Sequence, residues 1–290
     1  MPIKESELIL NPDGSVYHLN LKPENIATTI IFVGDQDRVE KITKHFDSIE
    51  FSTQKREFKT QTGLYKGKRL SVISTGIGPD NIDIVVNELD ALVNINLKTR
   101  QPKKEITALN IIRVGTSGSL QSDIPVDSFV LGTHGLDLTG LLHFYQIEPI
   151  SNPEMENAFI KHTNWHPNKA RPILIANSST LEKHFTSERT FSGITATAVG
   201  FYGPQGRVLR LPVQDAELND KMDSFEFNNN RISNLEMETS AIYGLSKLLG
   251  HHALSLNAII ANRANGTFSE NPKKIVEELI EYTLGKISTL

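Results

Sequence analysis

Cysteine is absent from this sequence of 290 residues, and tryptophan occurs only once. Without a thiol, the chain has no disulfide framework, no thiolate nucleophile and no thiolate metal site. Long apolar runs are missing too, since none approaches the roughly 20 residues that a membrane-spanning helix needs. An excess of positive charge is also missing, because the formal net charge is -4 with acidic and basic residues interspersed. These absences argue against a nucleic-acid or membrane partner.

What remains is the composition of a globular protein. Hydrophobic residues make up 38% of the chain and charged residues 22%, which is ordinary for a folded domain. The first residues, MPIKESELIL, lack the basic-then-apolar pattern of a secretion signal. We therefore expect a cytoplasmic protein in which residues 1–290 form one domain.

Strand-like and helix-like segments alternate along the chain. Apolar, β-rich runs occur at 28–34, 69–76, 110–115, 127–134, 171–177, 194–201, 233–237 and 253–262. Apolar residues recur at helical spacing in 35–46, 79–95, 153–164, 178–186, 238–250 and 271–287. This alternation predicts an α/β fold with a parallel or mixed central sheet. We expect residues 224–231 to form a surface loop.

Three of the predicted strands run into glycine, in the stretches VGDQDR, STGIGPD and RVGTSGS. We expect turns there, at the strand ends where α/β proteins commonly bind ligands. No Gly-Lys-Ser/Thr follows these glycines, and their spacing is not that of a dinucleotide fingerprint. ATP and NAD are therefore poorly supported as ligands.

Two arginines lie close to these glycines. Arg38 follows the first of them, and Arg113 lies inside a predicted strand, where a guanidinium needs a partner. Gly34, Thr116 and Ser117 would add N–H and hydroxyl donors. Two guanidinium groups with such donors suit an anion of the size of phosphate. A structural ion pair is the alternative interpretation of Arg113.

Two carboxylates flank Met237 where a predicted strand gives way to a helix. In an extended segment, Glu236 and Glu238 point the same way, and they could accept hydrogen bonds from sugar hydroxyls or stabilise a cationic carbon. Acidic residues are also common at a helix N-terminus, where they oppose the macrodipole. A pair of acids is typical of glycosidases as well, but nothing here assigns an acid and a nucleophile.

The stretch GFYGPQGRVLR places Phe201, Gln205 and Arg207 close together in a segment broken by glycines and a proline. These side chains suit a flat ligand with polar edges, because an amide supplies a donor and an acceptor and a guanidinium supplies donors. Two further residues, His18 and Arg56, gain no role from their own surroundings in the sequence.

Taken in order, these stretches resemble the uridine phosphorylases, within the broader nucleoside phosphorylase family. The resemblance rests on YHLNL, VGDQDRVEKI, REF, STGIG, IRVGTSGSL, LLHF, GFYGPQGR, NLEMETS and AIIANR, which span nearly the whole chain. It implies a single α/β domain whose twisted mixed sheet is partly closed as a barrel and flanked by helices. It also implies reversible phosphorolysis of uridine to uracil and ribose 1-phosphate, a reaction of pyrimidine nucleoside salvage.

The resemblance assigns roles to individual residues. Phosphate would be held by Gly34, Arg38, Arg113 and Thr116, together with Arg56 from a neighbouring subunit. Ribose would contact Glu236, Met237 and Glu238, with His18 of a neighbouring subunit at the 5′-hydroxyl. The base would contact Phe201, Gln205 and Arg207, with Arg263 behind it. The catalytic residues would be Arg113, Gln205, Arg207 and Glu238.

The resemblance further implies inorganic phosphate as co-substrate, no organic cofactor, and a homo-oligomer that is at least a dimer and a hexamer in many bacterial relatives. The sequence departs from the family pattern at Gln36, where proline is usual, and at 79–81, where small residues are usual. In bacterial members that second loop and a glutamate, here Glu57, bind a monovalent cation. Asn81 could supply an oxygen to such a cation, so the binding of potassium stays an open question. Residues 208–231 do not align with the family pattern.

Three rival functions remain. Nucleosidases use water and generally lack the phosphate-binding arginines, whereas this sequence keeps both Arg38 and Arg113. A purine phosphorylase would carry an aspartate near ANR, where this sequence has Asn262. A catalytically inactive nucleoside-binding relative is the alternative outside enzymes.

Overall fold

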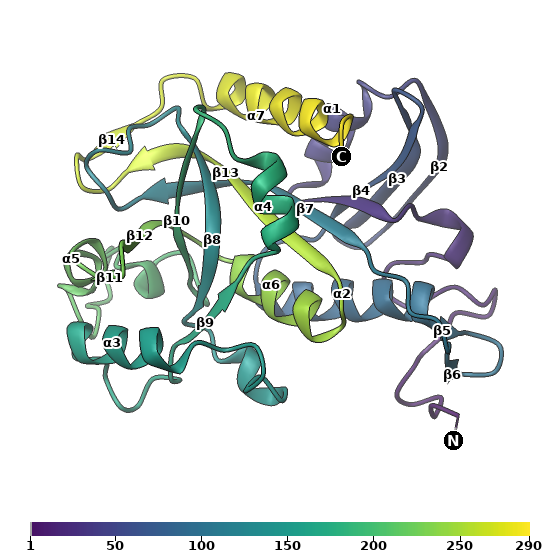
Figure 1. The fold of residues 1–290 in the computed structure, drawn as a ribbon, viewed down its shortest axis with the longest axis horizontal. Coiled ribbons are helices and arrows are strands. Elements are labelled where there is room, and N and C mark those ends of the chain that lie inside the picture. The colour runs from purple at the N-terminus through teal and green to yellow at the C-terminus, as the bar shows by residue number, and fades with distance from the viewer. Residues whose placement is uncertain (1) are drawn as a thin grey trace.

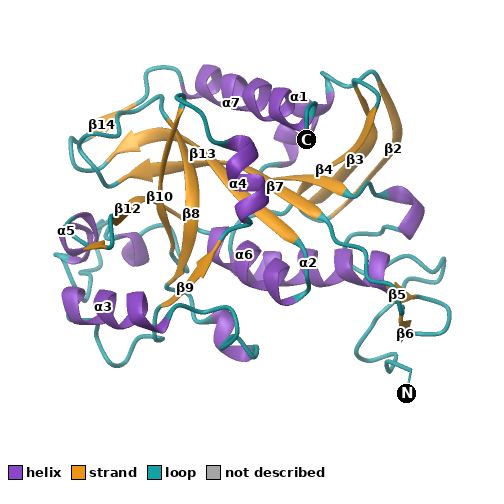
Figure 2. Ribbon diagram, viewed as in Figure 1, coloured by secondary structure: helices purple, strands orange, loops and turns teal. Residues whose placement is uncertain are grey.

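The computed structural model describes residues 2–290 (Figure 1). The long strands are β1 (Thr29–Val33), β2 (Ser48–Lys55), β3 (Phe58–Tyr65), β4 (Lys68–Ser74), β7 (Asn110–Ser119), β8 (Phe129–Asp137), β9 (Ile173–Ala176), β10 (Thr190–Thr197), β12 (Asn230–Glu236) and β13 (His252–Asn262). The short strands are β5 (Ile95–Asn96), β6 (Gln101–Pro102), β11 (Glu226–Phe227) and β14 (Thr267–Phe268). The α-helices, purple in Figure 2 together with short 3₁₀ turns, are α1 (Gln36–Thr43), α2 (Pro79–Asn94), α3 (Pro153–Thr163), α4 (Ser179–Phe185), α5 (Leu218–Asp223), α6 (Thr239–Leu248) and α7 (Pro272–Ile287). Each strand and helix predicted from the sequence overlaps one of these elements.

One large mixed sheet organises the fold. Its strands follow the order β11-β12-β10-β8-β13-β7-β1-β4-β3-β2. An additional antiparallel pairing of β12 with β7 joins Asn234 to Ser119 and closes β7, β13, β8, β10 and β12 into a ring. The remaining strands extend from this ring as an open, twisted sheet. The predicted fold class, with its partly closed barrel, is therefore confirmed.

Helices cover both faces of the sheet. Helices α2 and α6 pack on one side, where Leu89 and Ile242 belong to one buried apolar cluster. Helices α1 and α7 lie on the other side, where Ile42 and Leu279 belong to a second cluster; Figure 1 shows α7 above the strands and α2 with α6 below them. Within residues 2–290, no helix is both long enough and apolar enough to cross a membrane.

The third predicted glycine turn is wrong. The stretch GTSGS lies inside β7, because β13 continues alongside it and pairs with it up to Ser119. Gly115 has a packing reason instead: a Cβ there would lie 1.8 Å from Nη1 of Arg113 and 2.8 Å from Oδ1 of Asn257. The glycine leaves room for the arginine side chain that precedes it on the same face of the strand.

Two segments carry more regular structure than the sequence predicts. Strands β2 and β3 form an antiparallel hairpin whose inner face uses Thr60 and Thr62, so the apolar alternation that would reveal a strand is weak. The expected loop 224–231 contains the β11–β12 hairpin, which turns at Asn228 and Asn229. Both asparagines have positive φ, 47° and 63°, as a tight hairpin turn requires.

Candidate active site

Ten of the thirteen predicted site residues line one cavity of about 790 Å³. They come from the loop after β1, from β7, from the β12–α6 junction and from the segment after β10: Gly34, Arg38, Arg113, Thr116, Phe201, Gln205, Arg207, Glu236, Met237 and Glu238. The volume lies within the range typical of small-molecule sites. Predicted residues that are up to 204 positions apart in the chain, as Gly34 and Glu238 are, thus share one cavity.

One group of lining residues contains the two predicted phosphate arginines. Arg113 is 6% exposed, and its Nη1 donates to Oδ1 of Asn257 at 2.7 Å. Its Nη2 lies 2.5 Å from Oε2 of Glu238 and 3.2 Å from Oε2 of Glu236. Arg38 is held by a 3.2 Å hydrogen bond from Nη1 to the carbonyl of Val114.

The two carboxylates point the same way, as the sequence predicts, and each also holds the start of a helix, Glu236 that of α6 and Glu238 that of α2. The carboxylate of Glu236 accepts hydrogen bonds from the backbone N–H groups of Glu238 and Thr239 at 2.9–3.0 Å. Glu238 is the N-cap residue of α6 and accepts from the backbone N–H of Gly78 at 2.8 Å. The helix-terminus and ligand-facing interpretations therefore describe the same two residues.

Burial and charge together set the pKa values in this cluster. Burial raises the pKa of Glu238, although Arg113 acts against it. Burial works to lower the pKa of Arg113, but Glu236 and Glu238 outweigh it, so that pKa is raised. Burial lowers the pKa of Arg38, and the charge of Arg113 adds to this effect. The charge of each group here depends on its neighbours.

A second group of lining residues contains an amide and a guanidinium that contact each other. Gln205 is 3% exposed, and its Oε1 accepts a hydrogen bond from Nη1 of Arg207 at 2.5 Å. The Arg207 guanidinium stacks on Phe201, with Cζ 3.8 Å from the ring centroid, and donates to the Phe201 carbonyl at 2.6 Å. Both polar groups are thus held in place, and they line the same cavity as the first cluster.

Three predicted residues do not line this cavity. Arg263 packs its side chain 3.6 Å from the Cβ position of Gly118, and its pKa is lowered by burial and then by the charge of Arg207. His18 and Arg56 both lie close to Tyr17, and Arg56 is the neighbour of Glu57, which does line the cavity. The rings of His18 and Tyr17 are 4.8 Å apart, and Cζ of Arg56 is 6.0 Å from the Tyr17 ring.

The departure at Gln36 has a structural consequence. Its Nε2 donates to the carbonyl of Arg56 at 2.7 Å, and its Oε1 accepts from Nε2 of Gln54 at 2.9 Å. Arg56 forms the tip of the β2–β3 hairpin with φ at 55°. A proline at position 36 could make neither bond, so this chain ties the hairpin tip to α1 through its own glutamine.

Two lining or supporting residues escape the sequence argument. Asn257 lies in β13 and accepts the hydrogen bond from Arg113; the only signal was a polar residue inside a buried apolar strand. Phe268 in β14 lines the cavity while 64% exposed, and nothing in its local sequence marks it.

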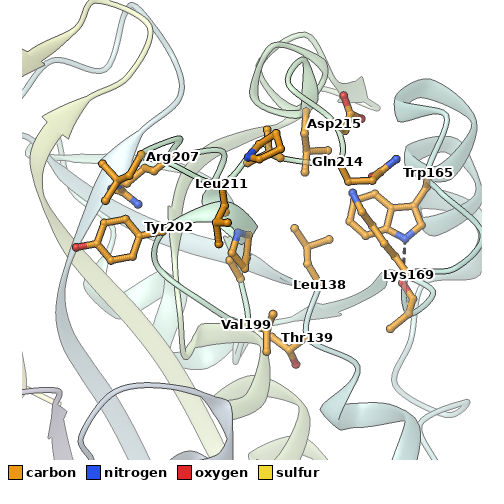
Figure 3. A pocket seen from close by; sticks show the side chains of 18 of the residues that line it. Leu138, Thr139, Trp165, Lys169, Val199, Tyr202, Arg207, Leu211, Gln214 and Asp215 are labelled. Atoms are coloured by element: carbon orange, nitrogen blue, oxygen red, sulfur yellow. Dashed lines mark hydrogen bonds between the residues drawn. The ribbon is translucent and has the colours of Figure 1, made fainter.

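A second cavity of about 890 Å³ lies beyond the segment from Tyr202 to Arg207. Figure 3 shows Tyr202 and Arg207 on one side of it and Trp165 with Lys169 on the other. Its lining is mostly apolar, and among the thirteen predicted residues it includes only Arg207. The smaller cavity is therefore the candidate active site.

Comparison with known proteins identifies the family. Residues 28–284 match the model of the Phosphorylase superfamily. The chain belongs to this superfamily. A uridine phosphorylase of Thermococcus kodakarensis is 29% identical over 90% of this chain and 83% of its own. A DeoD-type purine nucleoside phosphorylase of Shewanella loihica is 27% identical over 94% of this chain and 98% of its own.

A solved structure agrees with this assignment. The nucleoside phosphorylase of Trypanosoma brucei, described as showing uridine phosphorylase activity, superposes with a TM-score of 0.89. It is 28% identical, and the match covers 98% of this phosphorylase and all of the trypanosomal chain. The chain is thus an enzyme of the nucleoside phosphorylase family, and relatives named for pyrimidine and for purine substrates resemble it to similar degrees.

Proposed function

We propose that the chain catalyses the reversible phosphorolysis of uridine to uracil and ribose 1-phosphate. The observation that carries the proposal is the single cavity whose lining includes both Arg38 with Arg113 and Gln205 with Arg207. The carboxylates of Glu236 and Glu238 lie beside Arg113. These three groups of residues would bind phosphate, base and ribose, respectively, within one cavity.

The charges of the lining residues support a contribution from a second subunit. Besides Glu236 and Glu238, the carboxylates of Asp35, Asp37 and Glu57 line this cavity, so acidic groups outnumber the guanidinium groups of Arg38, Arg113 and Arg207. A phosphate dianion would gain little net attraction from such a set. Arg56 of a neighbouring subunit would add the missing positive charge, so we propose a homo-oligomer, at least a dimer.

The predicted base residues favour a pyrimidine with two carbonyl groups. The hydrogen bond from Arg207 assigns Oε1 of Gln205 to the side facing the guanidinium. Nε2 of Gln205 would then donate to uracil O2, Oε1 would accept from N3–H, and Arg207 would donate to O4. Cytosine carries an amino group in place of O4, and donor would face donor, a mismatch that can cost roughly 10⁴-fold in selectivity.

In the reaction, a phosphate oxygen attacks C1′ of the ribose while the bond from C1′ to N1 of the base breaks. The bonding electrons pass to the uracil ring, which later takes up a proton. Gln205 and Arg207 would bind this developing negative charge more strongly than they bind the neutral base, and this difference lowers the barrier. Glu238 would stabilise the positive charge on the sugar.

Asn262 supports the pyrimidine assignment over the purine one. Its Nδ2 donates to the carbonyls of Gln121 and Ile124 at 2.9 and 2.8 Å, and the side chain is buried away from the cavity. It offers no group to a purine N7, for which an aspartate would be expected. The purine phosphorylase function is the alternative that the assay below tests.

Two further expectations stay proposals. Glu57 and Asn81 converge at Gly76, where a Cβ would lie 2.9 Å from Cγ of Glu57 and 2.5 Å from Nδ2 of Asn81. Their oxygens could hold a monovalent cation, although residues 2–290 contain no cluster of three or more His, Cys, Asp or Glu side chains suited to a metal. We also propose a cytoplasmic location.

One assay tests the function: uridine, thymidine, cytidine and inosine, each incubated with and without inorganic phosphate. We expect uracil release from uridine only when phosphate is present, and no release from cytidine. Faster cleavage of inosine would make the chain a purine phosphorylase, and equal release without phosphate would make it a nucleosidase. Calorimetric binding of uridine without cleavage would indicate an inactive relative.

A further inference from the structure

His18 is fixed by one carboxylate of helix α2. Its Nδ1 lies 2.6 Å from Oε1 of Glu88, and its backbone N–H donates to the same carboxylate at 2.9 Å. The backbone N–H of Leu19 donates to Oε2 at 2.8 Å. The Glu88 side chain is 13% exposed and that of His18 is 27% exposed. The carboxylate thus holds both the imidazole and the backbone that carries it.

This contact assigns the tautomer of the imidazole. An ionised carboxylate only accepts hydrogen bonds, so the proton of neutral His18 must lie on Nδ1. Nε2 is then left with its lone pair, and within residues 2–290 it has no hydrogen-bond partner. A similar carboxylate–histidine pairing orients imidazoles in many metal and catalytic sites.

Helix α2 gives Glu88 a rigid base. Its buried face includes Val85, Val86 and Leu89. The residue before the helix, Gly78, donates its N–H to Glu238 at the cavity. The start of helix α2 is therefore anchored at the protomer's own cavity. Further along the same helix, Glu88, the residue before the buried Leu89, holds His18. A group on such an element keeps its position better than one on a free loop.

We propose that Glu88 is a positioning residue for the nucleoside site of a neighbouring subunit: it holds His18 in the Nδ1–H tautomer so that Nε2 faces the 5′-hydroxyl of the bound nucleoside. The proposal rests on the proposed function and on the resemblance to the uridine phosphorylases, which implies that His18 lies at that hydroxyl. Beyond the proposed function, it identifies Glu88 as the residue that sets the orientation and the tautomer of His18. Glu88 itself does not touch the substrate.

The test compares uridine with 5′-deoxyuridine, which lacks the hydroxyl. Glu88→Gln presents an amide N–H₂ group to N–H donors and should lower kcat/KM for uridine by about tenfold, the scale of one charge-assisted hydrogen bond. His18→Ala should cause a similar loss, and the double variant should lose little more, because the two residues act through one contact. With 5′-deoxyuridine all three variants should stay within about twofold of the wild type.

The matched control is Asp90→Asn. Asp90 lies on the same helix, and its Oδ1 is 3.3 Å from Nε2 of another histidine, His251. The change removes a carboxylate from α2 without touching His18, so the ratio of uridine to 5′-deoxyuridine activity should not change.

Imidazole ¹⁵N chemical shifts provide the second readout. The His18 signal should indicate the Nδ1–H tautomer in the wild type and a mixture of tautomers in Glu88→Gln.

Equal losses on uridine and 5′-deoxyuridine, or a His18 tautomer that does not respond to Glu88→Gln, would overturn the proposal. Failure of the proposed function is separate, since it is detected in the wild type alone as the absence of phosphate-dependent cleavage of any nucleoside. That result would also end the assignment of His18 to a 5′-hydroxyl.

Discussion

The guanidinium of Arg113 is buried inside a strand, contacts two carboxylates and lines the candidate active site. The sequence allowed either an anion site or a structural ion pair. The structure shows the ion pair, whose carboxylates are themselves the predicted ribose ligands, and the anion site stays a prediction. A bound phosphate would have to compete with Glu238 for Nη2, so binding and rearrangement of this contact are expected to be linked.

In the same cavity, Arg207→Ala removes a fixed donor from the base. We expect kcat for uridine to fall by about 10²-fold or more, because the guanidinium would stabilise charge that develops on the base in the transition state. Steady-state phosphorolysis of uridine measures this. Arg210→Ala is the control, since Arg210 lines the second cavity and not the candidate active site. Unchanged kcat/KM in Arg207→Ala would remove the assigned role.

Among the elements, β7 shows where local patterns mislead. Two glycines within five residues predict a turn, yet the strand continues to Ser119 because β13 pairs with it throughout. Gly115 leaves room for the side chain of Arg113, two residues earlier. By contrast, β1, β4 and α2 are predicted almost residue for residue, since β1 and β4 are continuous buried apolar runs and the buried residues of α2 recur at helical spacing.

Close packing of β8 against α6 gives a prediction for an element contact. A Cβ at Gly135 would lie 2.7 Å from Cα of Ser240 in the first turn of α6, and backbone atoms cannot move aside easily. Gly135→Ala should lower the free energy of unfolding by about 1–3 kcal/mol. It should also lower activity, because the same helix turn carries Glu238.

The control for this change is Gly285→Ala in α7. A Cβ at Gly285 would have no atom within 4 Å, and alanine favours a helix by up to about 1 kcal/mol over glycine. Thermal and denaturant unfolding should therefore give shifts of opposite sign for the two variants. A Gly135→Ala protein as stable as the wild type would show that α6 can move away from β8.

For the whole molecule, the main question is whether one chain completes a site. The side chains of His18 and Arg56 do not line the cavity; both lie near Tyr17, although Glu57 beside Arg56 does line it. The excess of acidic groups in the lining of the cavity points to the same missing positive charge. A closed symmetric dimer would give each site the missing pair from its neighbour.

Mixed oligomers test this arrangement. Arg113→Ala and Arg56→Ala should each be nearly inactive alone. When the two variants are co-expressed and pair at random, about a quarter of the sites should be active, because only one of the two sites in each mixed dimer keeps both arginines. Phosphorolysis of uridine by the purified mixture measures the recovery. Arg113→Ala mixed with Arg38→Ala should recover nothing, since both residues belong to the same half of each site. Recovery in that control, or none in the first mixture, would contradict sharing between subunits.

The sequence by itself determined the alternation of strands and helices and nearly all the polar residues of the candidate site. Burial imposes periods of two and 3.6 on short segments, and buried arginines or paired acids stand out against an apolar background. Only the tertiary structure decided that β12 returns to pair with β7, that Asn257 supports Arg113, and that Glu88 holds His18. Such contacts join residues far apart in the chain, and no local period records which distant partner a side chain meets.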